Sequence, residues 1–156
     1  MLKLIRIDDR LMHGQVAFTW TPALGIDCIL IANDRAPNDE FLKMTYGLAK
    51  PAAARLLIKT IKDTPAAIRD PKNQPARILL LVESVSDAAA LCETLPEIQS
   101  INFGGIRSKS GGKVFSKAVS LTEQEIGLIQ GLLEKGIELE IRQVPTDKKQ
   151  LVKNLI

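Results

Sequence analysis

Five short apolar runs, each too short to form a helix of ordinary length, recur along the first two thirds of the chain. They are rich in Ile, Leu and Val, which is typical of buried parallel strands. Longer segments, in which apolar residues have helical spacing, separate them. A strand followed by a helix, repeated several times, predicts βαβ units. The expected strands cover residues 2–7, 28–33, 54–59, 76–82 and 100–104.

The segments between these strands predict four helices. Several begin at a side chain suited to capping a helix, such as Asn38 or Ser86. The third helix is short and contains a proline. The expected helices cover residues 14–24, 38–50, 61–70 and 86–95.

The pattern changes after Gly104, where a loop with several glycines begins. A capping box from Thr122 to Glu125 opens a further helix, and Gly136 ends it. The remaining elements expected here are a strand over residues 113–121, a helix over 123–136, a strand over 137–144 and an amphipathic helix over 145–156.

Together these elements predict an α/β fold, an open and mostly parallel doubly wound sheet with helices on both faces. They leave room for one antiparallel strand near the C-terminus. The length of 156 residues, of which 46% are hydrophobic, fits one compact domain over residues 1–156.

The composition of the chain disfavours several classes of function. The net charge of +3 is small and aromatic residues make up only 4% of the chain, which disfavours a nucleic-acid-binding role. No apolar run approaches the roughly 18 residues of a membrane-spanning helix, and the N-terminus does not look like a signal peptide, so we expect a cytoplasmic protein. Cys28 and Cys92 lie far apart without a CxxC motif, which predicts neither a metal site nor a disulfide. We expect no cofactor.

The first strand leads into the segment RIDDRLMHGQV, residues 6–16, which contains His13, the only histidine of the chain. In doubly wound sheets, ligands bind beyond the carboxyl ends of the strands. The helix that follows presents the unpaired backbone N–H groups of Gly14, Gln15 and Val16, which favour an anion. A phosphoryl group on His13 would meet these donors.

Neighbouring residues suit this chemistry. Phosphorylation of an imidazole requires a ring nitrogen with a free lone pair, and a carboxylate that accepts the proton of the other nitrogen fixes which one that is. Asp8 or Asp9 can supply this carboxylate, and the sequence leaves the choice open. Arg10 can bind oxygens of the incoming phosphoryl group, and we expect it mainly to assist transfer. The competing interpretation of His13 is a helix-start residue without chemistry.

The same segment, together with Trp20, resembles the signature of the IIB components of the mannose, fructose and sorbose family of the bacterial phosphoenolpyruvate-dependent sugar phosphotransferase system (PTS). Further stretches agree, so the likeness covers essentially the whole chain. These stretches are IDCILIANDRAPND (26–39), INFGGI (101–106), SKAVSLTEQE (116–125) and EIRQVPTDKK (140–149).

The resemblance implies that His13 accepts a phosphoryl group from a phosphohistidine on a IIA protein. It then passes the group to a sugar that enters through the membrane components IIC and IID. By the same resemblance, the phosphorylated ring nitrogen is the one nearer the main chain, and Asp8 or Asp9 and Arg10 assist. The protein would then be cytoplasmic and peripherally associated with the membrane permease. The sequence leaves homodimerisation open.

Two further segments could either contribute to the site or have a purely structural role. Residues 103–115 could cradle a phosphate with their glycines, Arg107 and Lys109, but they lack the spacing of a Walker loop, and we expect a loop that flanks the site. Residues 33–39 either lie beside the first loop or form a turn capped by Asn38.

A function of another class is also open. The chain could be a non-catalytic α/β module that binds a phosphorylated ligand or a nucleotide at the same strand end. A histidine-phosphatase site is disfavoured, because that chemistry uses a second histidine and this chain has one.

Overall fold

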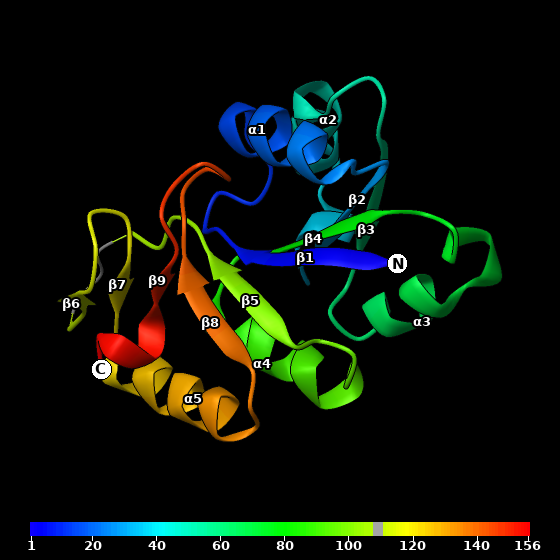
Figure 1. The fold of residues 1–156 in the computed structure, drawn as a ribbon. Coiled ribbons are helices and arrows are strands. Elements are labelled where there is room, and N and C mark those ends of the chain that lie inside the picture. Colours follow the sequence, from blue (N-terminus) through cyan, green and yellow to red (C-terminus); the bar gives the residue numbers. More distant parts are fainter. Residues whose placement is uncertain (108–110) are drawn as a thin grey trace.

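The apolar runs assemble into a seven-stranded sheet in the computed structural model, which describes residues 1–107 and 111–156 (Figure 1). Across the sheet the strands are β3 (Arg55–Lys59), β2 (Cys28–Ala32), β4 (Ile78–Val82), β1 (Leu2–Ile7), β5 (Ser100–Phe103), β8 (Glu138–Ile141) and β9 (Gln150–Leu151). Neighbours are parallel except β8 and β9, which are antiparallel. The expected fold class, with its antiparallel strand near the C-terminus, is confirmed.

Helices cover both faces of the sheet (Figure 1). One face carries α1 (Gly14–Leu24) and α2 (Glu40–Ala49), and the other carries α3 (Thr64–Arg69), α4 (Val85–Thr94) and α5 (Glu123–Glu134). Short 3-10 helices, η1 (Ala36–Asn38), η2 (Pro71–Asn73) and η3 (Val152–Asn154), lie in the connections.

The pleat of the central strands divides the core into two layers. Ile29 and Ile31 pair with Leu79 and Leu81, and all four belong to the apolar cluster that α1 and α2 cover. Leu30, which lies between the two isoleucines, belongs to the cluster on the opposite face. Because both faces are buried, these strands are apolar at every position instead of alternating with polar residues.

The connections of the central strands open a crevice at the carboxyl edge of the sheet. β1 lies between β4 and β5, and the chain leaves β1 towards α1 on one face. From its neighbour β5 the chain leaves towards α5 on the other face (Figure 1). Such a divergence of neighbouring connections is where open α/β sheets bind ligands. The loop that contains His13 follows β1 and lies at this edge.

Residues 113–121 form a hairpin, so the single strand expected here is wrong. β6 (Lys113–Val114) and β7 (Ser120–Leu121) pair antiparallel in a small separate sheet. The polar centre of the segment explains the turn, because the Ser116 hydroxyl accepts a hydrogen bond from the Ala118 N–H.

The amphipathic helix expected over residues 145–156 is also wrong, since this segment forms β9 and η3. The carboxylate of Asp147 accepts hydrogen bonds from the backbone N–H groups of Gln143 and Val144 and closes a turn. The turn directs the chain back along β8, where Leu151 pairs with Glu140. The helical spacing of apolar residues therefore does not reflect a helix in this segment.

Two helix caps differ from the expected ones, and one helix has both expected ends. Asp39, not Asn38, caps α2, and Ser84, not Ser86, caps α4. The helix α5 begins with the expected capping box of Thr122 and Glu125, and Gly136 follows its end at a φ of 81°. The wrong caps lie only one or two residues from the observed ones.

Candidate functional site

Backbone hydrogen bonds on both sides hold the loop that follows β1. The Asp8 N–H donates to the carbonyl of Val82 at the end of β4, and the Asp9 N–H donates to the carbonyl of Gly105 just after β5. The Leu11 N–H donates to the Asp8 carbonyl, and Leu11 has a φ of 56°. This left-handed conformation is unusual for a leucine and makes the loop turn sharply. The buried side chain of Leu11 packs into the core beneath α1.

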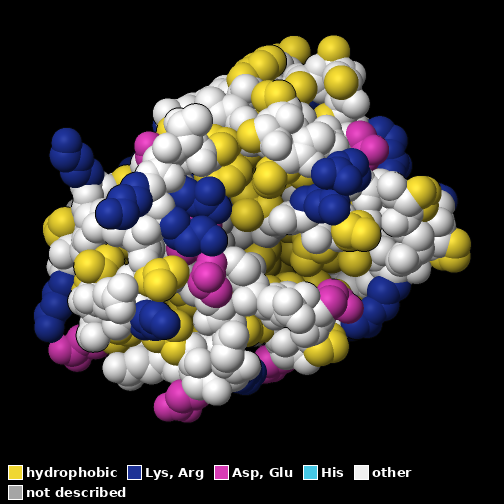
Figure 2. Space-filling model, viewed as in Figure 1, with side chains coloured by type: hydrophobic (Ala, Val, Ile, Leu, Met, Phe, Trp, Pro, Cys, Tyr) yellow, Lys and Arg dark blue, Asp and Glu magenta, His cyan; other side chains and the backbone are white. Residues whose placement is uncertain are grey.

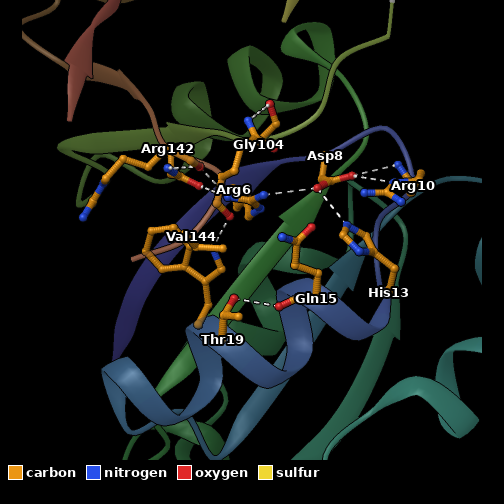
Figure 3. Close-up of polar contacts among 12 residues, drawn as sticks. Arg6, Asp8, Arg10, His13, Gln15, Thr19, Gly104, Arg142 and Val144 are labelled. Carbon is orange, nitrogen blue, oxygen red and sulfur yellow. Dashed lines mark hydrogen bonds and ion pairs between the residues drawn. The ribbon is translucent and has the colours of Figure 1, made fainter. Parts of the chain in front are cut away.

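His13 is the residue at which the loop becomes the helix α1. Its backbone is extended and its side chain forms no capping bond, so the imidazole is available for other contacts. The Nε2 atom lies 3.0 Å from Oδ2 of Asp8, and the side chain is 16% exposed (Figure 3). No hydrogen bond joins Nδ1 to another group within residues 1–107 and 111–156. The ring therefore lies at the rim of the sheet, partly open to solvent.

Asp8 is fully buried and is the centre of the polar contacts. Oδ2 accepts hydrogen bonds from His13 and from Nη2 of Arg6 at 3.3 Å, and Oδ1 accepts one from the Arg10 N–H at 3.1 Å. Burial alone would raise the pKa of this carboxyl. The hydrogen bonds from His13 and the Arg10 backbone, with the charge of Arg6, outweigh burial and lower the pKa of Asp8 below its ordinary value. Asp8 is thus a carboxylate at neutral pH and only accepts hydrogen bonds.

Asp9 and Arg10 have different surroundings although they are adjacent. Oδ2 of Asp9 accepts hydrogen bonds from the backbone N–H and Nε of Arg107, at 2.8 and 2.9 Å. Asp9 therefore fixes the chain after β5, and Asp8 is the carboxylate that contacts the histidine. The side chain of Arg10 is 53% exposed, and its Nε lies 3.9 Å from Oδ1 of Asp8.

The three residues expected to offer backbone N–H groups begin α1. Gly14 and Gln15 are exposed and Val16 is buried. The first carbonyl of the helix, that of His13, accepts from the Ala17 N–H, so the N–H groups of these three residues precede the helical ladder. Figure 3 shows the Gln15 side chain rising from the first turn of α1 beside the imidazole.

The sequence analysis missed a buried polar group directly behind Asp8. Arg6 is the second-last residue of β1, and its side chain is only 2% exposed. The sequence does show a charged residue, Arg6, between the apolar residues Ile5 and Ile7. It does not show which residue would pair with that charge. The partners of Arg6 come from strands that are distant in sequence. The buried Asn102 on β5 accepts a hydrogen bond from Arg6 and donates one to the buried Glu140 on β8, which also pairs with Arg142.

Segment 33–39 forms the expected turn, and its Ala36 packs in the same apolar cluster as Leu11 and Met12 of the first loop. The Asn33 side chain accepts hydrogen bonds from the N–H groups of Arg35 and Ala36. Asp34 accepts from the Ile61 N–H, and Arg35 pairs with Glu83 at 2.7 Å. These contacts join the segment to β3 and β4.

The loop after β5 does flank the site. Asp9, Arg10, Arg107, Lys117 and Gln143 are among the residues that line a pocket of about 500 Å³ between the loop after β1 and the hairpin β6–β7. Figure 2 shows Lys and Arg side chains over the hairpin and the neighbouring loops. Lys109, which was expected to add charge here, lies outside the described residues.

Among the described residues, no group of three or more His, Cys, Asp or Glu side chains could hold a metal ion. Cys28 and Cys92 are both buried free thiols. Within the same residues, no helix has the length and apolar character needed to cross a membrane.

Comparison with known proteins gives a consistent result. Residues 2–156 match the family described as the PTS system sorbose subfamily IIB component. The PTS system fructose-specific EIIB component of Bacillus subtilis (strain 168) is 32% identical over 147 residues, covering 94% of this chain and 90% of that protein. The PTS system mannose-specific EIIAB component of Escherichia coli (strain K12) is 33% identical over 156 residues, which is all of this chain and 48% of that protein. The chain thus spans about half the length of this relative.

Among solved structures, the IIBSor domain of the sorbose permease from Klebsiella pneumoniae superposes with a TM-score of 0.92. It is 29% identical in sequence, and the match covers 99% of this chain and 94% of that chain. The order of the elements and the sequence therefore lead to the same group of proteins.

Proposed function

The chain belongs to the sorbose-subfamily IIB components of the sugar phosphotransferase system, and on this basis we propose that His13 is the residue that carries the phosphoryl group. Proteins of this family act as phosphotransferases in sugar transport. The observation that supports His13 is its contact with Asp8. An ionised carboxylate on Nε2 requires that Nε2 carry the proton, which leaves the lone pair on Nδ1.

The proposed step is a displacement at phosphorus. The Nδ1 lone pair of His13 forms a P–N bond as the P–N bond of a donor phosphohistidine breaks, and the donor ring keeps that electron pair. Positive charge develops on the His13 ring during attack, and the carboxylate of Asp8 lies against Nε2 to stabilise it. In the second step an oxygen of the acceptor sugar attacks the same phosphorus and forms a P–O bond as the P–N bond breaks. The hydroxyl proton passes to water, and Nδ1 recovers its lone pair.

Arg10 and the start of α1 are proposed to stabilise the phosphoryl oxygens. A hydrogen bond to a charged group contributes about 1.5 to 3 kcal/mol, whereas a helix N-terminus at an exposed site contributes about 0.3 to 1 kcal/mol. Arg10 is therefore the stronger of the two contributions. The backbone N–H groups of Gly14, Gln15 and Val16 add to it without any movement of the chain.

The partners follow from the same proposal. The donor is a IIA protein, and the acceptor is a sugar that passes through the membrane components IIC and IID. Residues 1–156 act as one domain in the cytoplasm, attached peripherally to the permease. The mannose-specific relative, whose name combines EIIA and EIIB, supports a close association with the donor.

The test is phosphorylation in vitro with phosphoenolpyruvate, the general phosphotransferase proteins and a matching IIA protein. We expect one acid-labile, base-stable phosphate on the wild-type chain, and none on His13→Gln. A matched control is Lys72→Gln, which changes an exposed residue of η2 and is expected to label normally. Label that persisted on His13→Gln would contradict the proposal, because the chain has no second histidine.

A further inference from the structure

A chain of buried polar groups lies behind Asp8 and takes no direct part in the proposed step. Arg6 donates from Nη2 to Oδ2 of Asp8, and from Nη1 to Oδ1 of Asn102 at 2.6 Å and to the carbonyl of Arg142 at 2.9 Å. The amide of Asn102 donates to Oε1 of Glu140 at 3.0 Å. Figure 3 shows the Arg6 guanidinium between Asp8 and the backbone near Arg142.

Stability alone does not account for this arginine. Burial removes water from the guanidinium and lowers the pKa of Arg6, and its Nε has no partner among the described residues. Arg6 occupies a core position, with its guanidinium carbon 5.5 Å from the centre of the buried Trp20 ring. Apolar residues of similar volume often replace a buried ion pair without loss of stability. Its contact with Asp8 gives a second reason for a charge here, which is a role at the site.

We propose that Arg6 is a positioning residue for His13. Its guanidinium directs the Asp8 carboxylate at Nε2, and its positive charge opposes the uptake of a further proton by the Asp8–His13 pair. A carboxylate held against Nε2 keeps a proton on that nitrogen and directs the Nδ1 side of the ring outward. This inference rests on the proposed function of His13 and assigns a task to a residue that does not touch the reacting atoms.

The surroundings of Arg6 hold it in one place. Asn102 on β5 and the Arg142 carbonyl beyond β8 fix one side of the guanidinium. Gly104 leaves the space that it occupies, because a Cβ at this position would overlap the guanidinium. A fork of N–H donors held at several points fixes the carboxylate that it binds more precisely than a single flexible ammonium would.

The charges around the Asp8–His13 pair predict the sign of the effect. Without Arg6, the buried carboxylate of Asp8 loses its nearest buried cation, and the pair binds a proton more tightly. Asp9 and Arg107 neutralise each other at 2.9 Å, and Glu140 and Arg142 do so at 3.0 Å. Among the described residues, the charged groups around the pair are Arg6 from β1, Arg10 and Asp9 from the loop, Arg107 from the chain after β5, and Glu140 and Arg142 from β8 and its end.

The experiment compares Arg6→Met with Arg6→Lys and the wild type. His13 is the only histidine, so its ring-proton NMR signals are unambiguous during a pH titration. In Arg6→Met we expect the titration midpoint to move up by roughly one pH unit. At a pH below the wild-type midpoint, the fraction of neutral imidazole in Arg6→Met is then about tenfold lower than in the wild type, and the rate of phosphorylation falls by the same factor. Arg6→Lys keeps the charge without the fork and is expected to return the midpoint towards that of the wild type while restoring the rate only in part.

Two controls separate positioning from general stability. Arg69→Met removes an exposed guanidinium on α3 and is expected to leave the midpoint and the rate unchanged. Gly104→Ala displaces the Arg6 guanidinium without removing it and is expected to move the midpoint in the same direction as Arg6→Met, by a smaller amount. It also replaces Arg6→Met as the test variant if Arg6→Met does not fold.

An unchanged midpoint in folded Arg6→Met, or in Gly104→Ala where Arg6→Met does not fold, would overturn the inference. A lower melting temperature with an unchanged midpoint would have the same meaning, because it indicates a structural role alone. The proposed function fails separately, when the wild-type chain takes no phosphate from any donor. The titration uses no donor, so the two failures are distinguishable.

Discussion

The two carboxylate oxygens of Asp8 accept hydrogen bonds from N–H groups of three residues, His13, Arg6 and Arg10. This one side chain thereby decides which nitrogen of His13 faces outward. The sequence left Asp8 and Asp9 as equal candidates, since both follow the same strand. The contact of Asp9 with Arg107, 98 positions along the chain, distinguishes them in the structure.

Replacing the carboxylate tests this role directly. Asp8→Asn keeps the size of the side chain but removes its charge, so Nε2 no longer faces an acceptor that requires its proton. We expect phosphorylation of His13 to slow by about a hundredfold. Rapid-quench labelling measures this rate, and Asp9→Asn, which weakens the contact with Arg107, should slow it much less. Equal losses in the two variants would contradict the assignment to Asp8.

The lowered pKa of Asp8 also makes stability depend on pH. A carboxyl whose pKa is lower in the folded chain than its ordinary value of 3.8 stabilises the fold above that value, and this contribution is lost as the pH falls through the folded pKa. We expect the difference in unfolding free energy between wild type and Asp8→Asn to shrink as the pH falls below about 4. Urea unfolding at a series of pH values measures it. A difference that grew on acidification would have the wrong sign.

The half-exposed Arg10 should matter for transfer and not for folding. In Arg10→Ala we expect transfer to the sugar to slow about tenfold, since one charged hydrogen bond to the phosphoryl group is lost. The melting temperature should change little, because the 3.9 Å ion pair with Asp8 is partly exposed. Transfer to sugar in membranes containing IIC and IID is the assay. An unchanged rate would exclude Arg10 from the step.

Strands that are buried on both faces were the most predictable elements, because unbroken apolar runs such as residues 28–32 and 78–82 have no other common explanation in a short segment. The prediction of a helix over residues 145–156 was wrong because the apolar pattern there is ambiguous. Its few apolar residues fit a helix and a short strand equally well, and the side chain of Asp147 decides between them by closing a turn. Local hydrogen bonds of this kind are not visible in a hydrophobic pattern.

Some residues of the site could be predicted from the sequence and others could not. His13, Asp8, Arg10 and the start of α1 are adjacent in sequence, so the first loop could be predicted as a unit. Arg6 could not, because its partner Asn102 lies 96 positions away on another strand. Contacts between distant strands depend on the order and register of the sheet, which a single sequence does not provide.

Two glycines, one inside α5 and one just after it, should respond in opposite ways to replacement by alanine. Gly136, just beyond the helix, has a φ of 81°, which an alanine adopts only with strain, and we expect Gly136→Ala to destabilise the fold by about 1 kcal/mol. Gly127 lies inside the helix with open space at its Cβ, and Gly127→Ala should stabilise by about 0.5 to 1 kcal/mol. Urea unfolding of both variants gives the signs. A shared sign would contradict the assigned end of α5.

The order of the strands places the site where a partner can reach it. β1 is flanked by β4 and β5, so the loop after it is supported from both sides at the middle of the sheet edge. Next to this loop lies the pocket lined by Arg10, Arg107 and Lys117. The proposed phosphohistidine donor would bring negative charge to this region, and nearby cations would raise the rate of such encounters.

Donor recognition is therefore expected to depend on salt. With limiting donor, the phosphorylation rate should fall as ionic strength rises, and Lys117→Glu should raise the KM for the donor several-fold with little change in kcat. Steady-state phosphorylation at several salt concentrations measures both. A rate independent of salt would mean that the donor docks without help from these cations.

The short strand β9 has a consequence for solubility. It covers the open side of β8, and the opposite border strand, β3, begins and ends with the charged residues Arg55 and Lys59. Unpaired strand borders recruit other chains and start aggregates, and both of these measures prevent that. Removing residues 150–156 would leave the backbone groups of β8 unpaired on one side. The shortened chain would then tend to self-associate through that border, even with the phosphoryl site intact.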